Sequence, residues 1–458
     1  MQVITIDRAN FLKGFSSSRY IDDKGFSSLS QGWETFRAGY EGLLLPGRSL
    51  TELSTNLADN VVASIPIYRP SAFYYYSVGH TGRFYRTQVS ATLSHTALYR
   101  DTGKTYDSNS DILVFQGALY ATSTTDILRS DFGFTGGDPV NNWWTGTKGK
   151  TALTAGVPHI LFEANNTMYI TNGNIIAGWD GTTATDALLT LPTGYVITAI
   201  TIYGGYIKVA ASLNYSASSS LYNTQTKIFT WGGVLPQWIR EDPIDVPFVS
   251  AMRDVGGLLC IIGGYSLFVS DGFTFKQRYY DHYGGIPINW KQAVVNEGKL
   301  YWKCENGIMA YSKLYDSICQ PIYTTADIKT FDIYFSDFID IFGETNKCFR
   351  ASENNFPSTF YSNYFELPQP SYIRKIDLVS NSALVENSDW SLFINDKETG
   401  LSSAYPFTYA ADGAKTRRAF TGINHSTYSF RIQLQSNHSA NPPIKYIKIY
   451  YEPAERHS

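Results

Sequence analysis

The sequence predicts an all-β protein: a β-propeller of about seven blades, with six to eight allowed, between an N-terminal arm and a C-terminal β-sandwich-like sheet domain. Three observations support this fold class. A short turn followed by an aromatic and aliphatic strand recurs about every forty residues, the length of a four-stranded blade. Pairs such as Asn-Gly and Asp-Gly, which favour hairpin turns, follow these strands. Phe, Trp and Tyr make up 15% of the chain, which favours strands over long helices.

The repeated strands share a turn-forming pair that precedes hydrophobic residues. The copies lie at residues 117–120, 166–169, 204–207, 256–259, 298–301 and 336–339, with a degenerate copy at 72–75. Such a sheet cannot bury both faces alone, so neighbouring units are expected to stack around an axis, with tandem independent hairpins as the alternative. Gly181 and Gly272 are expected to hold positive φ in their turns, so Val at either position should destabilise a blade.

Changes in composition and in hydrophobic patterning divide the chain into three regions. Residues 1–66 form the predicted arm, residues 67–352 the propeller, and residues 353–458 the C-terminal domain, where 430–435 and 444–451 alternate as half-buried strands do. The arm carries aromatic anchors at Trp33, Phe36 and Tyr40. Two alternatives stay open: the arm binds a neighbouring subunit, or it supplies a strand that closes the last blade.

Composition limits the function classes. The formal net charge of −3 disfavours a sequence-independent nucleic-acid binder, although a local acidic or basic lining can hide within the average. No segment is long and apolar enough to span a membrane, and the N-terminus lacks the features of a signal peptide, so synthesis in the host cytoplasm is expected. The four cysteines lack metal-site spacing and are expected to be buried, reduced thiols: Cys260, Cys304, Cys319 and Cys348.

The sequence contains little that indicates catalysis. Its seven histidines are scattered singly, and Gly-x-Ser-x-Gly is absent. Residues 270–275 loosely resemble the Asp-box of sialidase propellers, but Asp-boxes are structural turns, and no arginines are singled out by spacing to hold a carboxylate. The sequence therefore predicts no enzyme, no catalytic residue, no cofactor and no metal.

Several aromatic residues are candidate contacts for a partner or a glycan. Trp143 and Trp144 lie in an insertion, where they either anchor a contact or fill the gap between two blades. Tyr279, Tyr280 and Tyr283 lie in a Tyr-rich segment that either stacks on sugar rings or is an ordinary strand end. Together with Trp33, Phe36 and Tyr40 of the arm, these residues form the predicted contact set.

The chain resembles a known group of proteins in its Gly-rich aromatic propeller, in Leu-Leu-Leu-Pro-Gly at 43–47, and in Asn-Pro-Pro-Ile-Lys-Tyr-Ile-Lys-Ile-Tyr-Tyr-Glu at 441–452. It looks like the β-propeller structural proteins of tailed-bacteriophage virions, above all tail nozzle (tail tubular) proteins and tail-hub or connector components. Nozzle proteins are usually longer. The resemblance implies a closed ring of six copies in the virion tail and no catalytic residues to carry over.

The function expected from this resemblance is structural. The ring would surround the DNA exit channel, contact adjacent tail and connector proteins, and touch passing double-stranded DNA in its lumen, where a neutral or acidic lining would let the duplex slide. The alternative is a receptor- or glycan-binding propeller on the tail or virion surface, acting in host attachment.

Overall fold

The computed structural model describes most of the chain as β-strands. The described residues are 1–13, 33–35, 37, 43–54, 59–69, 72–89, 95–131, 140–215, 225–280, 290–325, 327–334, 338–343, 347–355, 358–380, 390–400, 402–405, 407–408, 416–421, 426–436 and 443–454. By internal packing they form two compact units, one of Met1–Leu50, Asn306–Thr325 and Ala351–Ser458, the other of Thr51–Glu305 and Ala326–Arg350.

Seven antiparallel sheets follow one another along the chain as propeller blades. The strands of the first three are β5 (Val61–Arg69), β6 (Ala72–Gly79), β7 (Arg83–Val89) and β8 (His95–Asp101); β9 (Ile112–Phe115), β10 (Ala118–Thr122) and β11 (Ile127–Ser130); β12 (Leu161–Ala164), β13 (Thr167–Asn172), β14 (Ile175–Trp179) and β15 (Ala184–Thr190). The next two sheets are β16 (Tyr195–Tyr203), β17 (Tyr206–Leu213), β18 (Thr226–Trp231) and β19 (Trp238–Ile244); β20 (Val249–Asp254), β21 (Leu259–Gly263), β22 (Ser266–Ser270) and β23 (Phe275–Tyr280).

The last two sheets include strands from the N-terminal region. The sixth has the order β24 (Ala293–Asn296), β25 (Lys299–Cys304), β26 (Gly307–Ser312), β27 (Ser317–Tyr323), β2 (Trp33–Glu34) and β3 (Leu45–Pro46). The seventh has the order β28 (Ile328–Tyr334), β29 (Phe338–Gly343), β30 (Cys348–Asn355) and β4 (Arg48–Ser54). Short helical turns precede two blades, η1 (Trp143–Thr147) and η2 (Trp290–Gln292).

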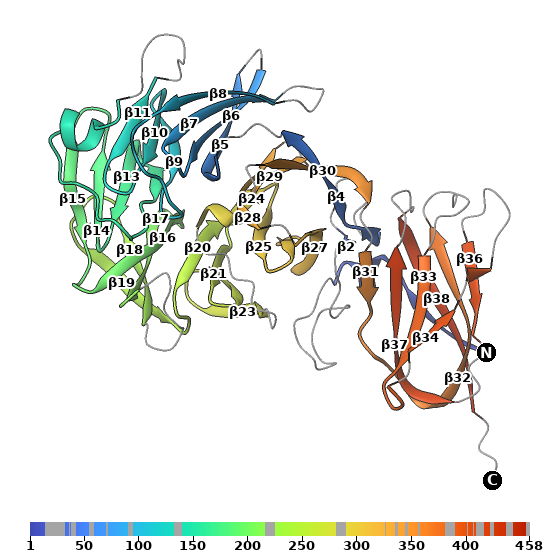
Figure 1. Cartoon of the computed structure of the whole chain (residues 1–458). Helices are drawn as coiled ribbons and strands as arrows, with labels where there is room; N and C mark the ends of the chain where they lie inside the picture. The colour runs from blue at the N-terminus through green and yellow to red at the C-terminus, as the bar shows by residue number, and fades with distance from the viewer. Residues whose placement is uncertain are drawn as a thin grey trace. The chain divides into compact units, whose positions relative to one another are not determined.

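The first strands of the seven blades form a closed circle (Figure 1). Each of them contacts the first strand of the next blade, and the circle closes where β28 contacts β5. These innermost strands are β5, β9, β12, β16, β20, β24 and β28, and all of them belong to the second unit. This closure confirms the predicted all-β propeller and fixes its blade count at seven.

Two Asp-Gly turns have the backbone geometry that the repeat pattern predicts. Gly181 and Gly272 have φ angles of 98° and 100°, as predicted for the Asp-Gly turns. Each preceding aspartate caps its turn, because Asp180 Oδ1 accepts the N–H of Thr183 at 2.6 Å and Asp271 Oδ1 accepts the N–H of Phe273 at 3.1 Å. Only glycine adopts such backbone angles without strain, so these pairs recur where hairpins reverse.

Part of the N-terminal region is built into the propeller blades and does not form a separate arm. The predicted boundary at residue 66 falls inside β5, and β4 takes the outer position of the last blade, as the strand-closing alternative expects. Leu53 of β4 is buried among Val61, Phe342 and Cys348. All four cysteines are buried.

The C-terminal strands form a nine-stranded sheet together with the first strand of the chain. Its members are β1 (Gln2–Ile6), β31 (Ser358–Tyr361), β32 (Phe365–Ser380), β33 (Trp390–Asp396), β34 (Ser402–Tyr405), β35 (Phe407–Thr408), β36 (Thr416–Phe420), β37 (Thr427–Ser436) and β38 (Ile444–Pro453), and the short helix α1 (Arg8–Phe11) follows β1. The long strand β32 pairs with β37 near its start and with β36 and β38 beyond. The two predicted alternating strands are β37 and β38, whose inward residues are mainly hydrophobic and buried.

Candidate functional site

The propeller axis is the first place to look for a site, because the first strands of all blades meet there. The helical turn η2 lies just before β24, and its three side chains, Trp290, Lys291 and Gln292, are all buried. Their hydrogen bonds lead to residues of several other blades. We call Asp111, Arg253, Trp290, Lys291 and Gln292 the axial network.

Asp111 is the acceptor of the axial network. It lies immediately before β9, and its Oδ2 accepts hydrogen bonds from Trp290 Nε1 at 2.8 Å and from the backbone N–H of Leu161 at 2.9 Å. Its Oδ1 accepts from the N–H of Ile112 at 2.9 Å. Burial raises the pKa of Asp111, and the charge of Lys291 and these N–H donors oppose that rise. One carboxylate thus joins the second, third and sixth blades.

Lys291 is held by backbone carbonyls. Its Nζ donates to the carbonyl oxygen of Ser108 at 2.9 Å and to that of Ser110 at 2.5 Å. Burial lowers the pKa of Lys291 to about 8, with the negative charges of Asp111 and Asp107 acting against the decrease. At neutral pH the ammonium is therefore still mostly protonated and remains a donor to both carbonyls.

Arg253 and Gln292 extend the network to the fifth and seventh blades. Arg253 Nη2 donates to the carbonyl oxygen of Trp290 at 2.6 Å, and its Nε donates to that of Ala293 at 3.0 Å. Gln292 Nε2 donates to the carbonyl oxygen of Ile328 at 2.8 Å. Burial lowers the pKa of Arg253 to about 10, which keeps it charged at neutral pH. The network therefore ties the innermost strands of five blades together, and its polar groups form these hydrogen bonds with other groups of the protein.

A second feature is an exposed hydrophobic surface on the turns of the fourth and fifth blades. Tyr206, Val234, Leu235 and Phe273 are 47%, 80%, 70% and 77% exposed, and we call them the apolar turn surface. The β16–β17 and β18–β19 turns lie at the same end of their antiparallel sheet. Tyr203 joins this end to the fifth blade, since its hydroxyl donates to the carbonyl oxygen of Gly257 at 3.3 Å.

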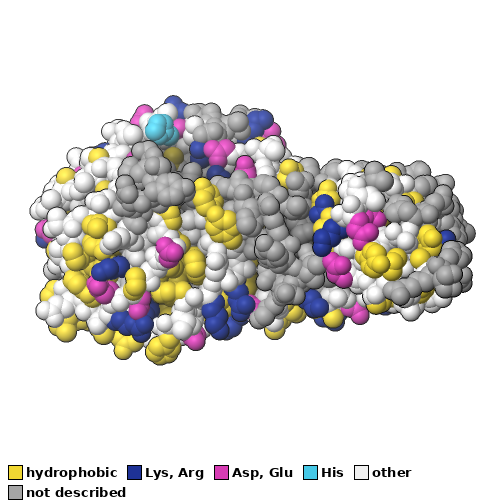
Figure 2. Space-filling view, turned by 90° about the horizontal axis from the view of Figure 1, so that it is seen from below, with side chains coloured by type: hydrophobic (Ala, Val, Ile, Leu, Met, Phe, Trp, Pro, Cys, Tyr) yellow, Lys and Arg dark blue, Asp and Glu magenta, His cyan; other side chains and the backbone are white. Residues whose placement is uncertain are grey.

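Clustered exposed hydrophobic residues of this kind mark interaction sites on soluble proteins more often than scattered ones do. Figure 2 shows one face of the molecule, on which hydrophobic side chains lie among Lys, Arg, Asp and Glu. Sequence reasoning missed this surface, because the turn residues Val234 and Leu235 carry no repeat or motif signal.

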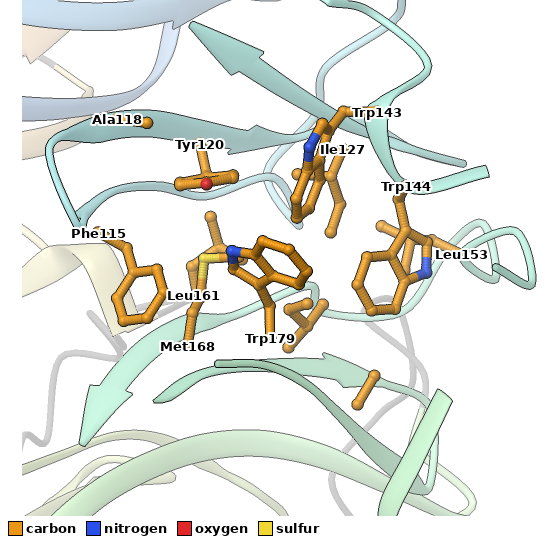
Figure 3. Close-up of a cluster of buried hydrophobic side chains, with 12 residues drawn as sticks. Phe115, Ala118, Tyr120, Ile127, Trp143, Trp144, Leu153, Leu161, Met168 and Trp179 are labelled. Carbon is orange, nitrogen blue, oxygen red and sulfur yellow. The ribbon is translucent and has the colours of Figure 1, made fainter. Parts of the chain in front are cut away.

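The predicted contact tryptophans are buried instead. Trp143 and Trp144 are 2% and 1% exposed and lie between the second and third blades (Figure 3). Trp143 packs edge-on against Tyr120 of β10 at 4.9 Å and against Trp179 of β14 at 5.3 Å between ring centroids. The π-helical turn η1 delivers both rings into this gap. The packing alternative therefore describes them, and a contact role does not, because neither ring reaches the surface.

The other predicted contact residues divide into three groups. Trp33 is buried against Phe360, and Tyr279 is buried against Trp302, so neither is free to contact a partner. Tyr280 is 40% exposed and stays a candidate. The remaining three lie outside the described residues: Phe36, Tyr40 and Tyr283.

Within the described part of the chain, no group of three or more His, Cys, Asp or Glu side chains is placed to hold a metal ion. None of its helices has the length and apolar character that crossing a membrane requires.

Comparisons with known proteins find distant structural similarities. No family model and no curated protein matches the chain. Among solved structures, it is similar to the Pan2 WD40 domain of Neurospora crassa, with 9% identity, a TM-score of 0.47, and 68% of this chain and 98% of that chain covered. It is also similar to an extracellular domain of a hybrid two-component system from B. thetaiotaomicron, with 11% identity, a TM-score of 0.47, and 94% and 64% covered.

A third similar structure is an exo-β-1,3-galactanase from Phanerochaete chrysosporium, with 9% identity, a TM-score of 0.32, and 84% of this chain and 95% of that chain covered. Similarities at this level of identity carry no functional assignment. The classification that the chain itself supports, through its closed circle of innermost strands, is a seven-bladed β-propeller with a C-terminal sheet domain.

Proposed function

We propose that this chain is a non-enzymatic structural protein of a tailed-phage virion, a nozzle or hub subunit that assembles as a ring of six copies around the DNA exit channel. The observation that carries the proposal is the axial network. Asp111, Lys291 and Arg253 are ionisable groups of this network, and their hydrogen bonds are made to the protein itself. Because these groups are engaged inside the fold, the contacts of the proposed assembly are assigned to the outer surfaces of the propeller.

The axial network also bears on where DNA would pass. The turn η2 lies across the inner strands and reaches Asp111, Arg253 and Ile328. A DNA duplex that passed along the axis would have to displace these buried hydrogen bonds, each worth about 1 kcal/mol, or more where a charged group takes part. The channel of the proposed ring therefore lies between copies, and the propeller forms part of its wall.

The apolar turn surface supports assembly through protein contacts. Val234, Leu235 and Phe273 present aliphatic and aromatic groups to solvent from turns, which are anchored by the sheets beneath them. Burying such side chains against another subunit contributes about 25 cal/mol per Å² of apolar area. We assign this surface to a contact with a second copy or with an adjacent tail or connector protein.

Native mass spectrometry tests the proposal, with the purified chain alone and mixed with the tail and connector proteins encoded beside it. A discrete ring, alone or with a partner, is the expected result. The double variant V234D/L235D should abolish the ring, because two carboxylates in a desolvated contact cost several kcal/mol. Leu314 is 80% exposed outside this surface, so L314D is the matched control and should assemble normally.

A stable monomer that ignores these partners would contradict the proposal and favour the alternative, a receptor- or glycan-binding propeller. One observation supports that alternative. Tyr280 lies edge-on to Tyr265 at 6.1 Å between ring centroids, and the neighbouring Phe248 lies edge-on to Tyr215 at 5.7 Å. The N–H of Gly264 donates to the carbonyl oxygen of Phe248, which brings the two aromatic pairs together. A glycan array with the monomer would test this patch as a sugar-stacking surface.

A further inference from the structure

The C-terminal sheet carries a second surface, on the side of β32, β36 and β38 opposite the buried Ile447 and Ile449. The register places Lys375 opposite Tyr450 and Asp377 opposite both Lys448 and Arg418. Because side chains alternate along strands, these residues share one face. We call Lys375, Arg418, Tyr446, Lys448 and Tyr450 the basic face.

Tyrosine rings hold the lysines of the basic face in place. Lys375 Nζ lies 3.9 Å from the centroid of the Tyr450 ring, and Lys448 Nζ lies 5.2 Å from that of Tyr446. Cation–π contacts at exposed sites are worth about 0.5–1 kcal/mol, enough to bias the orientation of a long side chain. The two ammonium groups are thus presented on a sheet, a more rigid support than a loop.

The charge balance of the basic face is positive. Asp377, the carboxylate between these lysines in the register, accepts hydrogen bonds from Nε and Nη2 of Arg418 at 2.6 and 3.0 Å. Among the described residues, neither Lys375 nor Lys448 forms an ion pair. A second carboxylate of this side, Glu452, pairs with Arg374 at 2.9 Å. The surface therefore keeps two cations that an anionic ligand could neutralise.

We infer that the basic face binds the phosphate backbone of a nucleic acid. Two ammonium groups on neighbouring strands, neither of them in an ion pair among the described residues, match successive phosphates in charge, and the interleaved tyrosines offer hydroxyls and ring surface to sugars and bases. The chain carries a net charge of −3, so a polyanion is attracted to this local excess of positive charge rather than to the molecule as a whole. This inference deepens the proposed function and rests on it for the source of the polymer, the DNA of the exit channel.

Fluorescence anisotropy tests the inference with the full-length protein and labelled oligonucleotides, one duplex and one single-stranded, across a salt titration starting at about 50 mM. The variant K375E/K448E should bind at least about tenfold more weakly, and the slope of log K against log salt should fall by about 2 for a duplex, because two phosphate contacts are lost. The control K227E/K397E changes the net charge equally at partly exposed lysines elsewhere and should bind as the native protein does.

Thermal unfolding of both variants shows whether the fold is kept, and Lys375→Gln with Lys448→Gln provides a milder second variant. Absence of binding at the lowest salt, or equal losses in basic-face and control variants, would overturn the inference. Binding to an acidic polysaccharide such as alginate without binding to either oligonucleotide would overturn it too. A ring without DNA binding refutes the inference alone, whereas DNA binding by a chain that never assembles refutes the ring alone.

Discussion

Asp332 is a buried carboxyl whose environment disfavours its charged form. It lies on β28, and its Oδ2 accepts a hydrogen bond from Ser64 Oγ of β5 at 2.8 Å. Asp340 stands opposite it on β29, paired with Arg350, and Cys348 lies nearby. Burial raises the pKa of Asp332 to about 7, and the charge of Asp340 adds to the rise. A titrating carboxyl therefore sits where the first and last blades meet.

This raised pKa predicts that the contact between the first and last blades, which we call the seam, loses stability as pH rises. The unfolded carboxyl ionises near pH 4 and the folded one near 7, so the contribution is fully present below about pH 4 and lost by about pH 7, at most about 4 kcal/mol. D332N removes the titration, so its free energy of unfolding relative to the native protein should rise across this window in denaturant titrations. Asp131, which is exposed, supplies the control D131N; a pH-independent D332N difference would contradict the assignment.

Gly272 offers a second prediction at the residue scale. Its φ of 100° is strained for any other residue, and a Cβ there would lie 3.2 Å from Tyr203 Cε1. Gly272→Val should lower the free energy of unfolding by about 1–3 kcal/mol. Gly232, where a Cβ meets only Ile239 at 3.9 Å, gives the control Gly232→Val. Equal melting temperatures for the two variants would contradict the turn assignment.

At the scale of elements, β4 illustrates how a short strand acts at the seam of the propeller. Its Leu53 packs with Phe342 and Cys348 of the last blade and with Val61, Tyr75 and Tyr85 of the first. The strand thus joins the two ends of the blade series through one hydrophobic cluster. Its sequence does not alternate in the way that the C-terminal strands do, so a strand closing the last blade was one of two alternatives that sequence alone left open.

Leu53→Ala should therefore destabilise the propeller by about 2–4 kcal/mol, since it opens a cavity in that cluster. Chemical denaturation measures the change. Leu314→Ala is the control, because its side chain is 80% exposed and leaves no cavity. A Leu53 variant as stable as this control would mean that β4 does not hold the seam.

At the scale of the whole molecule, the features that could be predicted from sequence are those that depend on residues close together in the chain. Repeated turns such as Asp180-Gly181 and the alternation in 430–435 arise from neighbouring residues, and both the propeller and the C-terminal sheet followed from them. The axial network could not be predicted, because Asp111 and Trp290 meet only after the blades have closed. The burial of Trp143 was one of two alternatives that sequence alone left open.

The basic face shows a related limit of sequence reasoning. The average charge disfavours nucleic-acid binding, and Lys375, Arg418 and Lys448 come from three separate segments. Only strand register brings them onto one side of a sheet. The position in the virion, the ring of six copies and the contact with DNA stay predictions until the assembly and binding experiments are made.

The burial of Leu53 beside Phe342 has a consequence for biosynthesis. Roughly three hundred residues separate the two positions, a contact of very high sequence separation. On the ribosome, β4 emerges early and must wait, with its hydrophobic side uncovered, until the last blade has been translated. A nascent chain of this kind is vulnerable to aggregation for most of its synthesis, so its yield should depend on chaperones and on the speed of translation.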